Sequence, residues 1–328
     1  MNYAVIGTNW LCENYRTAIR EAGDTFYAVL SRDMERAKTF AQGEAVPYDS
    51  MDALLADDQV DAVYLCLPNS MHHEAAIRAL RAGKHVLCEK PFALTLRQSE
   101  EMFREADKAG KVLAEGVMSF YSPAMEEIRS YVKQDTVVSA RLDYSQHSSK
   151  LDRVKKGAMF SSFDRRLGGG VLYDLGIYPI HFAVNLFGAP NAVSAKARWL
   201  GDVDVTDVII LDYGDFDVTV TVSKAGQSYI GSEILMDRGT LTFDNVSVVL
   251  GAKYVTKAGA QEISCGDGGI PLPGTNPSEE ASVQTRVIRR FTGWMQGEDR
   301  DGLLRLRENS LIVQKILEEA RAQIGYTL

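Results

Sequence analysis

The sequence lacks the features typical of secreted, membrane and nucleic-acid-binding proteins. Its 44 Asp and Glu outnumber its 36 Lys and Arg, and no cluster of basic residues offers phosphate a positive face. No apolar stretch approaches the ~20 residues that span a bilayer, and MNYAVIGTNW has no basic region ahead of an apolar one. We therefore expect a cytoplasmic protein with no nucleic-acid or membrane partner.

Cysteine is scarce. The four cysteines are scattered, with no CxxC pair and no histidine at metal-ligand spacing: Cys12, Cys66, Cys88 and Cys265. We expect reduced, mostly buried thiols and no metal site.

The first part of the chain alternates short apolar runs with helical patterns. A length of 328 residues allows two domains, and we place the boundary between 1–119 and 120–328. The predicted strands are 3–7, 26–31, 62–68, 85–89 and 112–118, with helices over 10–22, 33–42, 71–82 and 95–109. Nearly continuous apolar strands are buried on both faces, so this α/β pattern predicts a doubly wound parallel sheet.

The second part is different. Strands are predicted over 137–146, 192–201, 208–214, 217–226, 228–237 and 239–245, with helices over 122–133, 172–187, 278–296 and 303–324 and a Gly/Pro-rich loop at 265–277. Val alternates with Asp, Thr and Ser in 217–223, which indicates one apolar face. We expect an α+β domain with an open, mostly antiparallel sheet.

The first strand leads into a turn with few glycines. Only the first glycine of a GxGxxG pattern is present, as Gly7, with Asn9 and Cys12 in place of the others. Asn tolerates left-handed backbone angles, and Cys is small enough for close helix–strand packing. The motif by itself fits either a dinucleotide turn or an ordinary connection between strand and helix.

No acidic residue ends the second strand. An acid there would bind the adenosine ribose diol, whereas Arg accommodates a 2′-phosphate. The chain has Ser31 and Arg32, with Lys38 on the following helix, while Asp33 is placed to cap that helix. NADP is therefore expected and NAD is the second choice, unless Arg32 is only a solvated surface residue.

Polar residues follow two further strands where a ligand would sit. His72 lies near a helix start in LPNSMHHE, where it has either a structural role or a cofactor contact. Lys90 follows HVLCE and precedes Pro91, which disfavours helix. Lys90 either forms a surface ion pair or donates to a substrate oxygen beside a cofactor.

Two long motifs resemble one enzyme family. LPNSMHHEAAIRALRAGKHVLCEKP and GGGVLYDLGIYPIHFAVNLFG (168–188) are similar to signatures of the glucose–fructose oxidoreductase and inositol dehydrogenase family of NAD(P)-dependent enzymes. The resemblance covers essentially the whole chain. It implies an N-terminal Rossmann domain, a dimer formed through the open sheet face, and hydride transfer to or from a sugar, polyol or dihydrodiol.

The resemblance also implies roles for single residues. Lys90 would polarise the substrate oxygen with support from Glu89, and the Lys90–Pro91 bond would be cis. Asp174 would bind substrate, and Tyr178, its pKa lowered by the nearby lysine, would donate or accept the proton, with His181 as the competing candidate. The residues expected at the cofactor are Gly7, Thr8, Asn9, Trp10, Ser31, Arg32, Lys38, Leu67, Pro68, Asn69, His72, Glu89 and Lys90.

A polar segment at 144–150 leaves the first strand of the second domain. His147 and Lys150 in this segment either contact a hydroxyl-rich substrate or belong to a solvated loop. The expected protein is a homodimeric or homotetrameric NADP-dependent oxidoreductase. Two other functions remain open: a glycoside hydrolase of the same fold that uses NAD as a resident redox catalyst, and a non-catalytic nucleotide or sugar sensor.

Overall fold

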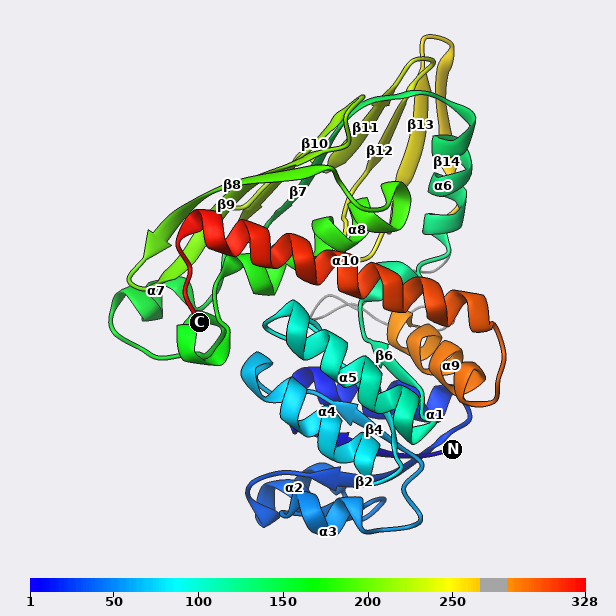
Figure 1. The fold of residues 1–328 in the computed structure, drawn as a ribbon, viewed down its shortest axis with the longest axis vertical. Coiled ribbons are helices and arrows are strands. Elements are labelled where there is room, and N and C mark those ends of the chain that lie inside the picture. Colours follow the sequence, from blue (N-terminus) through cyan, green and yellow to red (C-terminus); the bar gives the residue numbers. More distant parts are fainter. Residues whose placement is uncertain (266–281) are drawn as a thin grey trace. The chain divides into compact units, whose positions relative to one another are not determined.

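The computed structural model describes residues 1–265 and 282–328. The chain divides into two compact units (Figure 1). Unit 1 contains Met1–Gly116 and Pro277–Glu308, and unit 2 contains Val117–Asn276 and Asn309–Leu328. The predicted loop at 265–277, apart from Cys265, and the first residues of the predicted helix 278–296 lie outside the described residues.

Unit 1 is built around a six-stranded parallel sheet. Its strands are β1 (Asn2–Ile6), β2 (Thr25–Leu30), β3 (Val46–Tyr48), β4 (Ala62–Leu65), β5 (His85–Cys88) and β6 (Leu113–Glu115), in the order β3-β2-β1-β4-β5-β6. This is the strand order of a Rossmann fold, whose ligands bind where the order reverses between β1 and β4. The predicted doubly wound parallel sheet is confirmed.

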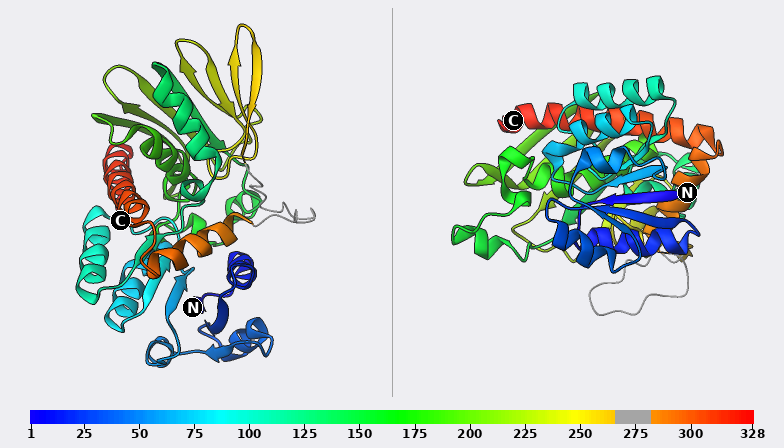
Figure 2. Two further views of the ribbon diagram at one scale, coloured as in Figure 1. Left: turned by 90° about the vertical axis from the view of Figure 1, so that its right-hand side faces the viewer. Right: turned by 90° about the horizontal axis from the view of Figure 1, so that it is seen from below.

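Helices cover both faces of this sheet, as Figure 2 shows in the view from below. They are α1 (Trp10–Glu21), α2 (Met34–Ala41), α3 (Met51–Leu55), α4 (His72–Arg81), the short 3₁₀ turn η1 (Asn69–Met71) before it, and α5 (Leu96–Ala109). The central strands between them are largely buried, and every residue of β4 is 0 % exposed, whereas the edge strand β3 is partly exposed. Burial on both faces explains why these strands are nearly continuous in apolar residues.

A late segment of the chain completes unit 1. Helix α9 (Val283–Met295) packs on α1, with the Tyr3 hydroxyl 2.7 Å from Oγ1 of Thr292 and Oγ1 of Thr285 donating to Glu21 at 2.5 Å. The prediction of two continuous domains, 1–119 and 120–328, did not include this return. The reason is that an amphipathic helix can cover any apolar face, and the sequence pattern does not say which.

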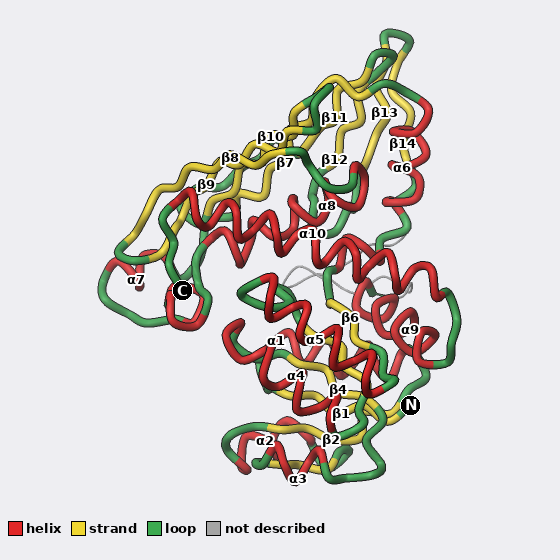
Figure 3. The backbone as a smooth tube through the Cα atoms, viewed as in Figure 1, coloured by secondary structure: helices red, strands yellow, loops and turns green. Residues whose placement is uncertain are grey.

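Unit 2 has an eight-stranded sheet in the order β14-β13-β12-β11-β7-β10-β9-β8 (Figure 3). The strands are β7 (Val137–Ser145), β8 (Ala192–Leu200), β9 (Val203–Asp212), β10 (Asp217–Ser223), β11 (Ser232–Met236), β12 (Thr240–Phe243), β13 (Ala252–Thr256) and β14 (Gly259–Ile263). All neighbours are antiparallel except β7 and β10, so the predicted open, mostly antiparallel sheet is confirmed.

The helices of unit 2 are α6 (Ala124–Gln134), α7 (Leu151–Lys155), α8 (Ile177–Phe187) and the later part of α10 (Arg300–Ile324). Unit 2 also contains three 3₁₀ turns and one π-helical turn: η2 (Met118–Tyr121), η3 (Ser161–Phe163), η4 (Arg165–Leu167) and the π-helical η5 (Leu172–Gly176).

The sheet of unit 2 has exposed large apolar side chains, namely Val138, Trp199, Val208, Ile210 and Leu235. None of the helices described in either unit is long and apolar enough to cross a membrane.

Candidate functional site

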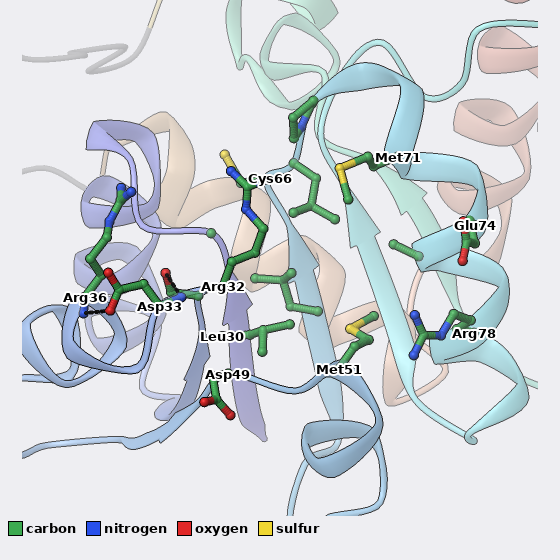
Figure 4. Close-up of a pocket in the computed structure, with 16 residues that line it drawn as sticks. Leu30, Arg32, Asp33, Arg36, Asp49, Met51, Cys66, Met71, Glu74 and Arg78 are labelled. Atoms are coloured by element: carbon green, nitrogen blue, oxygen red, sulfur yellow. Dashed lines mark hydrogen bonds between the residues drawn. The ribbon is translucent and has the colours of Figure 1, made fainter. Parts of the chain in front are cut away.

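A cavity of about 680 Å³ opens at the carboxyl ends of β1, β2 and β4 in unit 1 (Figure 4). Its lining includes five of the residues that the sequence places at the cofactor: Gly7, Ser31, Arg32, Leu67 and Pro68. The carboxyl ends of parallel strands at a change of strand order are where nucleotides bind in such sheets. This cavity is the candidate dinucleotide site.

The turn between β1 and α1 requires a glycine at its first position. Gly7 has a φ of 125°, and its amide donates to the carbonyl of Leu30 at 3.0 Å. A Cβ on this residue would lie 2.6 Å from the carbonyl oxygen of Cys66 and 3.1 Å from Sγ of Cys12. The backbone thus passes so closely over its neighbours that only glycine fits.

Asn9 does not use the left-handed backbone that its residue type tolerates. Its φ is −88°, and it is the N-cap of α1, accepting from the amides of Leu11 at 2.9 Å and Cys12 at 3.1 Å. Capping favours an extended residue whose side chain satisfies amides of the first turn. Thr8 is half-buried beside Gly7, whereas Trp10 is 71 % exposed.

Three guanidinium groups, those of Arg32, Arg36 and Arg78, line the cavity. Asp33 caps α2 as predicted, accepting from the amides of Glu35 at 2.9 Å and Arg36 at 3.3 Å. Arg36 is also within 3.5 Å of Oγ1 of Thr8, so it lies between the turn and the end of β2. Arg36 and Arg78 were not identified from the sequence; Arg36 is four residues after Arg32, on the first turn of the capped helix.

Lys38, predicted at the cofactor, is not among the residues that line the cavity. Its ammonium pairs with Glu35 one turn earlier on α2 at 2.7 Å, and its side chain is 56 % exposed. An i,i+3 pair of this kind is a common surface feature of helices.

His72 joins two loops. The ring is fully buried, with Nδ1 2.8 Å from the carbonyl oxygen of Pro91 and Nε2 2.9 Å from that of Leu67. Burial lowers the pKa of His72, and this outweighs the two carbonyls, which favour the charged ring. His72 therefore ties the cavity wall at Leu67 to the segment that follows Lys90. Asn69 begins η1 between them.

Glu89 is buried behind the backbone of Lys90. One carboxyl oxygen accepts from the Tyr64 hydroxyl at 2.8 Å, and the other from the amide of Lys90 at 3.3 Å. Burial raises the pKa of Glu89 to about 7, although the charge of Lys90 opposes the shift. Lys90 is half-buried, and the bond to Pro91 is cis, as expected. Glu89 thus supports the loop that carries the lysine.

In unit 2, Asp174 and Tyr178 lie one turn apart on η5 and α8. Oδ2 of Asp174 is 2.8 Å from Nζ of Lys224, a residue that the sequence interpretation missed. Tyr178 is 8 % exposed and packs edge-on against the ring of Tyr144 at 5.3 Å between centroids. His181 is buried one turn further along the same helix, at 2 % exposure.

The polar segment after β7 lies beside Lys224. The amide of Ser148 donates to the carbonyl of Lys224 at 2.9 Å, while the His147 amide bonds the Gln227 side chain. His147 and Lys150 are themselves exposed, with the Lys150 ammonium 5.5 Å from the centre of the Phe160 ring. Their substrate roles stay predictions.

Two buried carboxyls, Asp204 and Asp207 of β9, share the interior near this cluster. Asp204 accepts from the amide of Leu172 at 2.6 Å, and neither oxygen of Asp207 accepts a bond from a donor in the described ranges. Burial, then the charge of Asp204, raises the pKa of Asp207 to about 9. Asp207 is therefore protonated at neutral pH and donates to Asp204.

This carboxyl pair predicts a pH-dependent stability. The pKa of Asp207 is raised from 3.8 to about 9 in the folded protein. Its contribution to the free energy of unfolding is therefore fully present below about pH 4 and is lost as the pH rises toward 9. The free energy of unfolding is expected to fall by up to about 1.4 kcal/mol per pH unit in that window. Asp207→Asn, which donates without titrating, should flatten the decline in urea titrations.

Asp217→Asn on the exposed start of β10 is the matched control and should keep the wild-type slope. Equal slopes for Asp207→Asn and the wild type would contradict the shared proton.

No group of three or more His, Cys, Asp or Glu side chains within 1–265 and 282–328 is arranged to hold a metal ion. The site residues instead fit a dinucleotide. At Gly7 the backbone leaves no room for a Cβ, and the N-terminus of α1 follows this turn. The arginines that line the cavity are suited to binding phosphate, as backbone amides at a helix N-terminus are.

Comparisons with known proteins agree with this geometry. Residues 1–117 match the oxidoreductase family with an NAD-binding Rossmann fold (GFO/IDH/MocA), and residues 135–256 match the GFO/IDH/MocA C-terminal domain. The chain is 33 % identical over 330 residues to scyllo-inositol 2-dehydrogenase (NADP(+)) IolU of Bacillus subtilis, covering 99 % of this chain and 97 % of that protein.

Other relatives are more distant. Mouse trans-1,2-dihydrobenzene-1,2-diol dehydrogenase is 27 % identical over 343 residues, covering 100 % of this chain and 98 % of that protein. KijD10, a 3-ketoreductase from Actinomadura kijaniata crystallised with NADP and TDP-benzene, has the same fold, with a TM-score of 0.82, 24 % identity and coverage of 99 % and 98 % of the two chains. The chain belongs to the GFO/IDH/MocA family of oxidoreductases.

Proposed function

We propose that the protein is an NADP(H)-dependent oxidoreductase that transfers hydride to or from a hydroxyl or carbonyl carbon of a sugar, polyol or dihydrodiol. The observation that carries the proposal is the cavity at the β1, β2 and β4 ends, built on Gly7 and lined by arginines. The named relatives act on scyllo-inositol and on a dihydrodiol, which supports this substrate class.

The residues at the end of β2 favour NADP over NAD. Asp33 is the nearest carboxylate after the strand, and it caps α2 instead of meeting a ribose diol. Arg32 and Arg36 offer planar, permanently charged donors, which suit a 2′-phosphate. NADP(H) would therefore be held with its pyrophosphate at the N-terminus of α1 and its adenosine phosphate at these arginines.

The protein groups proposed for the chemistry are Lys90, Tyr178 and Asp174. In the reducing direction the cofactor supplies the hydride to carbon. The Lys90 ammonium donates a hydrogen bond to the substrate oxygen, and Tyr178 gives that oxygen its proton. The oxidising direction reverses both transfers. The proposal requires the ammonium and the phenol to reach the same oxygen.

Asp174 would accept a hydrogen bond from a substrate hydroxyl and so orient the substrate. His181 is buried in α8, which favours packing over proton transfer. We further propose that the protein is cytoplasmic and forms a homodimer or homotetramer. Val208, Ile210 and Trp199 on the sheet of unit 2 are exposed apolar side chains that a second copy would cover.

Turnover with a substrate panel tests the proposed function. Purified protein is incubated with scyllo-inositol, aldoses, other polyols, a dihydrodiol and a glycoside, each with the oxidised or the reduced form of NADP or NAD, and the absorbance of the reduced cofactor is followed. Substrate-dependent reduction of NADP⁺, faster than that of NAD⁺, is expected. Glycoside cleavage without net absorbance change, or no turnover in either direction, would refute the oxidoreductase.

Cofactor preference gives a second prediction. Replacing Arg32 and Arg36 together with serine removes two charged donors, so the KM for NADP⁺ is expected to rise about tenfold or more. The KM for NAD⁺ should change little, because NAD lacks the phosphate. Initial rates at varied cofactor concentration measure both values.

Lys38→Ser is the matched control for this experiment, because Lys38 pairs with Glu35 and does not line the cavity. It should leave both KM values unchanged. A parallel rise for NADP⁺ and NAD⁺ in the Arg32 and Arg36 variant would mean that these arginines do not discriminate the phosphate.

A further inference from the structure

Lys224 is a buried ammonium placed behind Asp174. It follows directly on β10, and its backbone amide donates to the carbonyl of Val205 at 2.8 Å. The residue is 2 % exposed, and Nζ donates to the carbonyl of Ser162 at 2.6 Å as well as contacting Asp174. Burial of a lysine is costly unless its charge is paired and its donors are satisfied. Here both conditions are met.

The surroundings hold the ammonium from several sides. Nζ lies 4.5 Å from the centre of the Phe163 ring, a distance that allows a cation–π contact. The charged groups around it are Asp174 of η5 and, from β9, Asp204, which shares a proton with Asp207. That proton leaves the two β9 carboxyls with one negative charge between them. The carboxylate in direct contact with Nζ is that of Asp174, at 2.8 Å.

Exposure differs sharply between the two partners of this ion pair. The side chain of Asp174 is 35 % exposed, whereas that of Lys224 is 3 % exposed. A solute can therefore reach the carboxylate but not the ammonium. A carboxylate offers acceptor oxygens only, so a ligand that reaches Asp174 must donate the hydrogen bond. Hydroxyl groups are the donors that polyols and sugars offer.

We propose that Lys224 is a positioning residue that fixes the carboxylate of Asp174 as an acceptor for a substrate hydroxyl. The inference rests on the proposed function, since it assigns Asp174 to substrate binding. It narrows the substrate class to molecules that carry, besides the reacting group, a hydroxyl that can donate to this carboxylate.

A double-mutant cycle tests this proposal. With scyllo-inositol and NADP⁺, Lys224→Met is expected to lower kcat about 10²-fold through misplacement of the carboxylate, with a smaller change in KM. Lys224→Arg should restore part of the loss because it keeps the charge. In an Asp174→Asn background, Lys224→Met should add less than about threefold, since its effect passes through Asp174. Lys315→Met, at an exposed lysine of α10, is the control and should retain activity.

Two outcomes would overturn the proposal. Additive losses in the cycle would show that Lys224 does not act through Asp174. If the loss of activity across the variants simply parallels their loss of melting temperature, Lys224 has a purely structural role. If Lys224→Met does not fold, Lys224→Gln and Lys224→Arg provide the same cycle.

A structural readout separates this inference from the proposed function. If the wild type turns over no polyol, sugar or diol, the proposed function fails. A crystal structure of the Lys224→Met variant then decides the remaining claim. A displaced Asp174 carboxylate would support the role of Lys224 in fixing it, whereas an unmoved carboxylate would contradict it.

Discussion

Replacing Lys90 with methionine is expected to lower kcat by about 10²–10⁴-fold while leaving NADPH affinity nearly unchanged. Methionine keeps an unbranched chain of similar length but has no donor for the substrate oxygen. The loop should keep its path because its anchors lie elsewhere: Glu89 accepts from the Lys90 backbone amide, and His72 contacts the Pro91 carbonyl. Steady-state rates and a fluorescence titration with NADPH measure the two effects.

Lys108→Met is the matched control for this substitution. Lys108 is an exposed lysine at the end of α5 that pairs loosely with Glu105 at 3.8 Å, so its loss should leave kcat unchanged. Unchanged turnover in Lys90→Met would remove Lys90 from the mechanism. A large loss of NADPH affinity would instead assign the residue to cofactor binding.

Replacing Gly7 with alanine is expected to impair both folding stability and cofactor binding. The new Cβ would meet the Cys66 carbonyl oxygen, which belongs to the backbone and cannot move aside cheaply. The φ of 125° adds strain for any residue with a side chain. The expected cost is about 3 kcal/mol in the free energy of unfolding, measured by urea titration. NADPH affinity should fall at least about tenfold, because the turn amides shift.

Gly23→Ala separates the effect of the positive φ from the effect of the close approach to a neighbouring backbone. Gly23 also has a positive φ, 86°, but nothing lies within 4 Å of its Cβ position. It should therefore show only the backbone penalty of about 1 kcal/mol and retain NADPH binding. Equal effects at both glycines would mean that the close approach to Cys66 does not matter.

The parallel sheet was predictable because its signals are local. β4 is apolar throughout, β1 and β5 are apolar at all but their first positions, and helix starts such as Asp33 and Thr95 carry capping side chains. β3 was missed because it has three residues, a proline among them, and is partly exposed. β13 and β14 were missed for a similar reason, since four of the five residues of β14 are exposed and give no apolar alternation.

The candidate site was predictable only where a motif marks it. The sequence predicts site roles for Gly7, Arg32, Lys90 and Asp174 from their positions after strands or within family signatures. Lys224 stands at the end of an ordinary alternating strand, and its importance comes from a contact with a residue fifty positions earlier. The role of His72 likewise depends on tertiary contacts, because its ring bonds the carbonyls of Leu67 and Pro91, which lie in two different loops.

The return of α9 to the first sheet has a consequence for synthesis on the ribosome. Domains usually fold from the N-terminus as they emerge, but the partner of α1 is encoded near residue 290 of 328. The face of α1 that packs on α9 therefore stays exposed until translation is almost finished. We therefore expect unit 1 to be completed, and to bind its nucleotide in the complete form, only after nearly all of unit 2 has been synthesised.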